Sequence, residues 1–457
     1  MKSSKECKDP TFSAAKLYGL IGLGLTLLVM SLVSLMSDTV FILMKYHTRI
    51  SVGTTVYNIL RKENPGAYLY VYIFNITNAE AFLSGKDYKL KVEEVGPFTY
   101  QEFRTNEQFE LDEDAGVMRY FPNVTTKFIA HLSIGDPRSF NVTVPNAAML
   151  TMSSMLSSQP FFIKAAFNLL TARLRSEPII NMSVESYLWG YDEPLIALGN
   201  SILPGWITFK TMGLMDRLYD KSVIPRLEVS ITDKEKFKVK KMNGDEGLKF
   251  WGYENPKTRS RCNSFIDTYE AYAYFPGITK DDKIRIYRSI FCRFLELEYV
   301  GTISTDVSPV AFVYELNNQT YSRNSDNKCL CGEINSCVDG ISDMSPCLYG
   351  LGIGLSNAHF LHSDPKIYER IEGINPSVEK HGSRFVVDPR LGVVLDTSIA
   401  VQVNMMVKNV DFISKEKAFS NMFVPLGFFK AVQAELPEDT KSHIGSFYVF
   451  YTYLIHG

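Results

Sequence analysis

The first marked feature of the chain is a long apolar segment near its start. Residues Leu17–Ser37, LYGLIGLGLTLLVMSLVSLMS, hold 21 positions without a charged side chain. A helix of that length spans about 30 Å, the thickness of the apolar part of a bilayer. The segment lacks a polar face, is longer than the apolar part of a signal peptide and ends without an Ala-x-Ala-like cleavage site. The pattern predicts a transmembrane helix with an apolar extension, TVFILM, up to residue 44.

Beyond this segment, short aromatic and β-branched stretches are separated by turn residues. The stretches 67–78 (AYLYVYIFNITN) and 92–103 (VEEVGPFTYQEF) predict strands, with a Gly-Pro break between two halves of the second. Residues 135–145 predict a turn and then a strand, and 386–408 predict a hairpin around a Pro-Arg-Leu-Gly turn. Because no long linker divides the region, we expect one large α+β body built on an antiparallel sheet.

Two segments in the middle of the chain have a helical character instead. The stretches 146–158 and 161–175 hold few β-branched residues and no interior Gly or Pro, and the pair Gln159-Pro160 separates them. In the second helix the polar residues form one narrow stripe at helical spacing. Two interpretations stay open: the stripe is the solvated face of a packed helix, or the helix lies at a ligand or partner surface with cationic ends. The stripe consists of Lys164, Asn168, Thr171 and Arg175.

The last residues become strongly apolar again. The stretch from Phe447 to Gly457 has 11 residues, too few to cross a bilayer as a helix. It predicts either a terminal β-strand or the start of a second membrane span whose remainder is missing.

The charged residues indicate which side of the membrane each part occupies. The formal net charge is −2 and no long basic run occurs, which argues against a nucleic-acid partner. Lysines at positions 2, 5, 8 and 16 precede the apolar segment and only Lys45 and Arg49 follow it closely, which favours a cytoplasmic N-terminus. Five Asn-x-Ser/Thr triplets, all downstream, are N-glycosylation candidates and agree with an extracellular or lumenal body. Their asparagines are Asn75, Asn123, Asn141, Asn181 and Asn318.

The seven cysteines divide between the two sides. Cys7 precedes the span, where S-acylation and an inert thiol are both open interpretations. The other six lie between Cys262 and Cys347, and an even number in an oxidising compartment predicts disulfides. Their spacing in CLCGEINSC is not that of a zinc finger, and Cys-x-x-Cys is absent. The sequence alone does not fix which cysteines pair.

Motifs for catalysis are absent from the sequence. It contains no G-x-S-x-G, no H-E-x-x-H and no phosphate-binding loop. His359 and His362 stand three positions apart and could share a helical face as a metal pair, although a local turn or core role is commoner. We therefore expect no enzyme, no metal and no cofactor.

Several stretches, taken in order, resemble one protein family. The chain is similar to the class B scavenger receptors, the CD36 family, which includes lysosomal and insect sensory members. Each motif is weak alone, and the specificity lies in their order and spacing through nearly the whole outer region. The motifs are EVGPFTY (94–100), LWGYDEP (188–194), AYFPG (273–277), CLCGEINSC (329–337), AHFLHSDP (358–365), IEGINP (371–376) and VQVNMMVK (401–408).

This resemblance implies a fold and a membrane topology. The expected parts are a cytosolic tail (1–16), a transmembrane helix with its extension (17–44), a CD36-type outer domain (45–446) and the start of an incomplete second span (447–457). The fold class is an α+β membrane protein whose outer domain is a large antiparallel β-barrel, capped by an apical helical bundle and crossed by an apolar tunnel. Members of the family have two spans, so the missing second span is a departure.

The resemblance also implies functional residues. By position it implies the disulfides Cys262–Cys329, Cys292–Cys347 and Cys331–Cys337, and palmitoylation at Cys7. It places the helix 161–175 in the apical bundle, where basic residues attract anionic lipids or particles. The expected ligand-binding residues are Lys164, Arg173, Arg175, Phe161 and Phe162.

Two classes of function are compatible with these implications. The first is a scavenger receptor that binds fatty acids, sterols or lipoprotein at the apical helices and passes lipid through the tunnel to the membrane. The second is a protein-binding receptor for lysosomal sorting, adhesion or phagocytic recognition, or a pheromone co-receptor. Residues 146–176 contain no histidine, which favours the plasma membrane over a lysosomal or endosomal membrane. Expected partners are lipids or lipoprotein particles, the membrane, protein ligands and a second copy of the chain.

Overall fold

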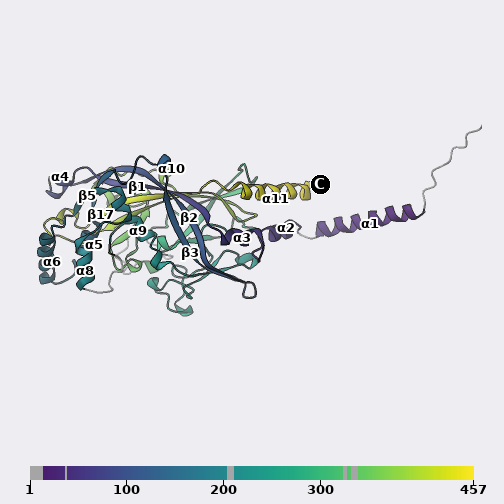
Figure 1. Cartoon of the computed structure of the whole chain (residues 1–457), viewed down its shortest axis with the longest axis horizontal. Helices are drawn as coiled ribbons and strands as arrows, with labels where there is room; N and C mark the ends of the chain where they lie inside the picture. Colours follow the sequence, from purple (N-terminus) through teal and green to yellow (C-terminus); the bar gives the residue numbers. More distant parts are fainter. Residues whose placement is uncertain (1–13, 37–38, 203–209, 323–326, 331–337, 457) are drawn as a thin grey trace, which may run out of the picture.

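The computed structural model describes residues 14–36, 39–202, 210–322, 327–330 and 338–456. Helix α1 (Ala14–Met36) projects from one end of a large body, and α2 (Thr39–His47) and α3 (Thr55–Arg61) lie where it joins that body (Figure 1). Within the described residues, one helical stretch is long and apolar enough to cross a membrane, Lys16–Val33 in α1. The predicted transmembrane segment is therefore helical over its described part.

The body is built on one sheet of 15 strands, whose described pairs are antiparallel except β8–β9 and β14–β2. The two edge strands of the sheet, β7 and β8, lie close together. Lys238, next to β7, forms an antiparallel bridge with Tyr269 of β8. The sheet is therefore nearly closed. In spatial order the strands are β7 (Val239–Met242), β6 (Leu227–Ser230), β3 (Val117–Phe128), β2 (Leu90–Asp112), β1 (Asn64–Ile76), β17 (Phe423–Val432), β16 (Val393–Met406), β15 (Arg384–Asp388), β11 (Ala311–Leu316), β10 (Phe294–Ile303), β9 (Ile284–Tyr287) and β8 (Thr268–Tyr269), with β12 (Ser342–Asp343), β13 (Ile353–Asn357) and β14 (Ile371–Glu372) attached.

The break predicted at the Gly-Pro pair does not occur, because both residues lie within strand β2. The strand runs without interruption through Gly96 and Pro97. The register between β1 and β2 shifts between Val71 and Ile73, opposite this point. A Cβ at Gly96 would lie 2.7 Å from the carbonyl oxygen of Val71, so only glycine fits this close approach. The Gly-Pro pair thus marks an irregularity inside one strand, of the kind that bends a sheet.

The predicted hairpin is formed by β15 and β16, which pair antiparallel. Its turn is organised by Asp388, a fully buried residue. One carboxyl oxygen of Asp388 accepts hydrogen bonds from the backbone N–H groups of Arg390 and Leu391, each at 2.9 Å. These bonds satisfy turn donors that would otherwise be buried without a partner.

The two predicted helices are α5 (Ala147–Leu156) and α6 (Phe161–Leu174). They are connected to the body by a separate two-stranded ribbon, β4 (Asn141–Pro145) with β5 (Ile179–Ser183). Helices α5 and α6 contact each other and α8 (Pro194–Ile202). Together they lie at the end of the body opposite α1 (Figure 1).

The apolar C-terminal stretch belongs to helix α11 (Glu438–His456), so the alternative of a terminal β-strand is wrong. The helix begins before Phe447, inside the predicted outer domain. Glu438 and Asp439 in its first turn favour a helix N-terminus electrostatically. The helix contacts α2 and is fixed to the sheet by Tyr448, whose hydroxyl donates to Asp388 at 2.6 Å.

Candidate functional site

Two adjoining cavities occupy the interior of the body. The first has a volume of about 420 Å³ and extends to Ala147, the first residue of α5. The second has a volume of about 410 Å³ and extends to Thr48, which follows α2, and to Pro437, which precedes α11. Apolar side chains such as Leu218 line both. The two cavities therefore span most of the distance between the α5 end and the end that carries α1.

Where the cavities meet, their walls carry charges. Six polar residues line both cavities, and we call them the ionic belt. Such a cluster is unusual in an apolar interior, because ionised groups lose hydration there and persist only when they are paired. The ionic belt consists of Glu102, Arg104, Tyr219, Glu270, Tyr272 and Arg288.

The ionic belt contains two ion pairs. The guanidinium of Arg104 lies 3.0 Å from a carboxylate oxygen of Glu270, and that of Arg288 lies 3.4 Å from Glu102. The hydroxyl of Tyr219 donates to Glu102 at 2.7 Å. Burial lowers the pKa of Arg104 and the charge of Glu270 raises it, and the net result is a pKa above the ordinary value. Burial, followed by the charge of Glu102, raises the pKa of Tyr219 well above its usual range.

Helix α6 presents an apolar surface to solvent. Phe161, Phe162 and Leu169 are 82%, 69% and 74% exposed. The polar stripe is not uniformly solvated: Arg175 is exposed and Lys164 and Asn168 are half-buried, whereas Thr171 is 1% exposed. The hydroxyl of Thr171 donates to the carbonyl of Asn168 within the helix at 2.9 Å. Exposed apolar groups of this size are typical of surfaces that meet a partner, a lipid or a membrane.

The five predicted ligand-binding residues do not converge on one point. Phe161 and Phe162 begin α6, whereas Arg173 and Arg175 are exposed at its end. A rise of 1.5 Å per residue separates the two groups by roughly 18 Å. The ammonium of Lys164 lies over the ring of Phe412, 5.3 Å from its centre. None of these five residues lines either cavity.

A buried carboxyl group lies beneath α5. Glu416 is fully buried, and one of its oxygens accepts a hydrogen bond from the hydroxyl of Ser153 at 2.7 Å. The other oxygen, also buried, has no partner among the described residues. Burial raises the pKa of Glu416 to about 8, although the bond from Ser153 lowers it. The carboxyl group is therefore largely protonated at neutral pH.

Because of Glu416, the stability of the folded protein should depend on pH. Between about pH 4.5 and about pH 8 the unfolded chain has lost this proton and the folded chain keeps it, so stability falls as pH rises through that window. Glu416→Gln should therefore raise the thermal unfolding midpoint at the upper end of the window and leave it unchanged at the lower end. The same substitution at the exposed Glu254 is the control. A Glu416→Gln midpoint that tracks the wild type at every pH would contradict the prediction.

The exposed Glu94 and the buried His359 and His381 form a further cluster, with potential ligand atoms within 4.8 Å of one another. The backbone N–H groups of Asn375 and Ser377 donate to Nδ1 of His359 and His381, at 3.0 and 3.2 Å. Each neutral ring therefore carries its proton on Nε2, and His359 is 2.8 Å from Glu94 through that atom. A ligating histidine normally donates a hydrogen bond from its other ring nitrogen, so the described cluster does not fit a metal ion.

His359 and His362 do not share a helical face, and the buried His359 fits the commoner core role rather than a metal pair. The short 3-10 helix η9 (Ala358–Phe360) ends before His362, which is exposed, whereas His359 is buried and stacks on His381 with ring centres 4.3 Å apart. Burial and then the neighbouring His359 lower the pKa of His381 to about 4. His381 therefore remains neutral in mildly acidic conditions.

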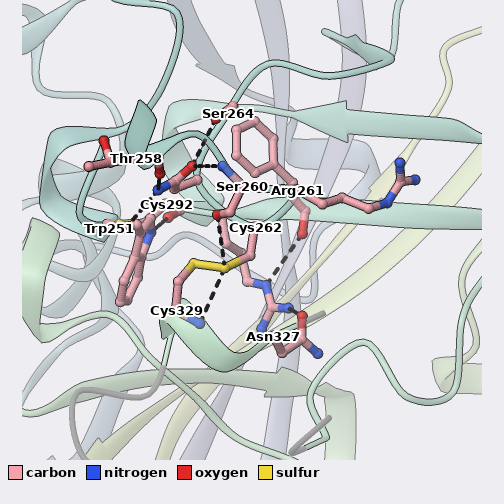
Figure 2. The surroundings of a disulfide bond; sticks show 12 residues. Trp251, Thr258, Ser260, Arg261, Cys262, Ser264, Cys292, Asn327 and Cys329 are labelled. Carbon is pink, nitrogen blue, oxygen red and sulfur yellow. Dashed lines mark hydrogen bonds between the residues drawn. A yellow bond between two sulfur atoms is a disulfide. The ribbon is translucent and has the colours of Figure 1, made fainter. Parts of the chain in front are cut away.

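The described residues include two disulfides, Cys262–Cys329 and Cys292–Cys347, the pairs that the family resemblance implied. Figure 2 shows the first: the backbone N–H of Cys329 points at the sulfur of Cys262, 3.2 Å away. The indole nitrogen of Trp251, nearby, donates to the carbonyl of Cys292 at 2.6 Å. Cys7, Cys331 and Cys337 lie outside the described residues.

The candidate glycosylation sites differ in their surroundings. Asn141, Asn181 and Asn318 are exposed. Asn75 is half-buried, and its side-chain oxygen accepts from the N–H of Thr143 at 2.8 Å. Asn123 is 9% exposed, and its amide donates to Glu107 within the β2–β3 pair. A glycan at Asn123 would have to displace that bond.

Comparison with known proteins assigns the family. A sequence profile of the CD36 family matches residues 20–455, so the chain belongs to this family of membrane proteins. It is 27% identical to scavenger receptor class B member 1 of Bos taurus, over 84% of this chain and 74% of the relative. It is 27% identical to lysosome membrane protein 2 of Rattus norvegicus and 26% identical to that of Homo sapiens, each over 86% of this chain and 80% of the relative.

Proposed function

We propose that this protein is a membrane-anchored scavenger receptor that captures apolar ligands at α6 and passes lipid through its two cavities toward the membrane. The observation that carries the proposal is the position of the cavities, which adjoin at the ionic belt and extend from α5 to the ends of α2 and α11. The named relatives, a scavenger receptor and a lysosome membrane protein, support a receptor in a membrane. We propose no chemical reaction.

The energetics suit passive transfer. An acyl chain gains about 0.8 kcal/mol for each CH2 group that leaves water. A chain that moves from a particle or membrane into an apolar cavity keeps this gain, so the step costs little. The exposed Phe161 and Phe162 would supply the first apolar contact. Arg173 and Arg175 would attract anionic lipids or particles at the other end of α6.

The test is uptake of labelled cholesterol and labelled palmitate from lipoprotein by cells that express the full chain. Leu218 is half-buried and lines both cavities, so Leu218→Trp should obstruct the path. We expect uptake to fall about tenfold while particle binding stays unchanged, a loss of about 1.4 kcal/mol. Val378→Trp, at a 63% exposed position outside both cavities, is the matched control. Normal uptake by Leu218→Trp at equal surface abundance would refute transfer through the cavities.

The same cells separate capture from transfer. Arg173→Ala/Arg175→Ala should reduce binding of anionic particles, because both cations are exposed on α6. If particle binding persists in this variant, capture occurs elsewhere on the protein. If particles bind but lipid never enters the cell, the function that remains is recognition of a protein or particle.

A further inference from the structure

The two ion pairs of the ionic belt, Arg104 with Glu270 and Arg288 with Glu102, differ in the number and length of their hydrogen bonds. Arg104 donates to both oxygens of Glu270, at 3.1 and 3.0 Å, and to the side chain of Asn106 at 3.1 Å. The ring of Tyr272 covers its guanidinium at 4.2 Å. Glu270 also accepts from the hydroxyl of Tyr120. In this half of the belt, both oxygens of Glu270 and two nitrogens of Arg104 have partners at ordinary hydrogen-bond distances.

Arg288 is bound much less completely. A single nitrogen, Nη2, lies 3.4 Å from each oxygen of Glu102. Glu102 has a shorter bond, 2.7 Å, from Tyr219. Within the described part of the chain, Nε and Nη1 of Arg288 donate no hydrogen bond. The side chain is 22% exposed and lines both cavities, so these donors are accessible from the interior space.

The surroundings of Arg288 suit an anion joined to an apolar tail. The described lining of the first cavity carries four cationic and three carboxylate side chains, an excess of one positive charge. The described lining of the second cavity has no charged side chain apart from the ionic belt. A bound amphiphile could therefore place its charge at Arg288 and its chain in the second cavity, among residues such as Phe237, Ile399 and Phe429.

We propose that Arg288 is a specificity-determining residue that binds the carboxylate of a long-chain amphiphile at the junction of the cavities. This inference rests on the proposed lipid transfer and adds a preference within it. The carboxylate accepts from the free Nη1 of Arg288, while Tyr219 holds Glu102 to one side. Neutral amphiphiles of the same length gain no such contact and are bound less tightly at this point.

The physical basis is the cost of moving an ionised carboxylate through an apolar interior. An unpaired buried ion loses several kcal/mol of hydration even after the protein relaxes. A guanidinium with unused donors offsets this loss, because its charged N–H groups form strong hydrogen bonds to a carboxylate. An alcohol requires little such compensation. The ionic belt thus acts on the headgroup, whereas the apolar walls act on the chain.

The test is photo-crosslinking of the full chain in intact cells. The probes are hexadecanoic acid and hexadecan-1-ol that carry the same photoreactive group in the chain, and the readout is labelled receptor per receptor at the surface. Arg288→Gln should reduce labelling by the acid about tenfold, equivalent to about 1.4 kcal/mol, and change labelling by the alcohol less than about twofold. Arg259→Gln, an exposed arginine outside both cavities, is the matched control.

A second variant keeps the test decisive if Arg288→Gln fails to reach the surface. Glu102→Gln retains an oxygen for Tyr219 and removes the carboxylate that competes for Arg288, so it should raise labelling by the acid relative to the alcohol. Equal losses of both probes in Arg288→Gln, or an unchanged acid-to-alcohol ratio in Glu102→Gln, would overturn the role of Arg288. Failure of the wild type to take either probe would instead reject the proposed lipid transfer.

Discussion

Replacing both Cys292 and Cys347 with alanine should greatly reduce the amount of folded protein that reaches the cell surface. The bond joins positions 55 residues apart, and closing a loop of that length stabilises a fold by about 4 kcal/mol in the chain-entropy account. Domains are typically stable by only about 5–15 kcal/mol. Both cysteines also line the first cavity, so the cavity wall would loosen with the loss of the bond. Surface biotinylation measured against total protein tests this expectation.

The control for this experiment is Val378→Ala, at a 63% exposed position of the outer body. It should leave surface abundance unchanged, because it removes no bond of the outer body. The double alanine variant avoids a free thiol that could pair wrongly with another cysteine. Wild-type abundance of Cys292→Ala/Cys347→Ala would show that the sheet is stable without this bond.

Asp388→Ala should destabilise the protein by about 3 kcal/mol or more, since each buried donor that loses its acceptor costs about 1–3 kcal/mol. Besides the two backbone donors of its turn, Asp388 accepts from the hydroxyls of Ser308 at 2.7 Å and Tyr448 at 2.6 Å. The substitution therefore loosens the β15–β16 turn and detaches α11 at the same time. The thermal unfolding midpoint of the detergent-solubilised full chain measures the loss.

Two further variants separate these contributions. Tyr448→Phe removes one hydroxyl, which donates to Asp388 and accepts from Ser308, and should cost about 1 kcal/mol. Asp396→Ala changes an exposed aspartate on β16 and should have almost no effect. If Tyr448→Phe were as damaging as Asp388→Ala, the attachment of α11 rather than the turn would be the dominant contribution.

Local sequence patterns were sufficient to predict helices and hairpins, whose backbone hydrogen bonds join residues within one element or in two consecutive elements. Helices α5 and α6 follow from the absence of Gly and Pro and from the Gln159-Pro160 stop between them. The β15–β16 hairpin follows from its turn and its apolar flanks. Family resemblance added the two disulfides, which no local pattern specifies. In each case the information lies in neighbouring residues or in an ordered set of motifs.

The orientation of α6 could not be predicted in the same way. A polar stripe on an apolar helix normally faces water. Here Thr171 faces inward and satisfies its hydroxyl within the helix, while Phe161 and Phe162 face outward. Only the packing against α5 and α8 decides this rotation. The outward face of α6, with Phe161 and Phe162, is the surface at which we propose that ligands are captured.

The ionic belt could not be predicted from local sequence either, because Glu102 and Arg288 are 186 positions apart. A partial signal was present in β2. Phe98, Tyr100 and Glu102 are buried two positions apart, and Arg104 follows on the same face of the strand, although Thr99 on the other face is buried as well. Charges at the inward positions of a strand indicate a buried ion pair or a ligand site. Their partners, however, come from segments that only the closed sheet brings near.

The ribbon of β4 and β5 brings together the two ends of the segment that contains α5 and α6. Pro145 and Ile179 face each other across it, so the chain leaves and re-enters the body at almost one place. Substitutions between these residues that keep the contacts of α5 with β16 and Glu416 should leave the register of the large sheet unchanged. Related receptors could thus differ in this segment while keeping the same large sheet and interior cavities. Exchanging residues 146–178 between two members of the family would then transfer recognition as a cassette.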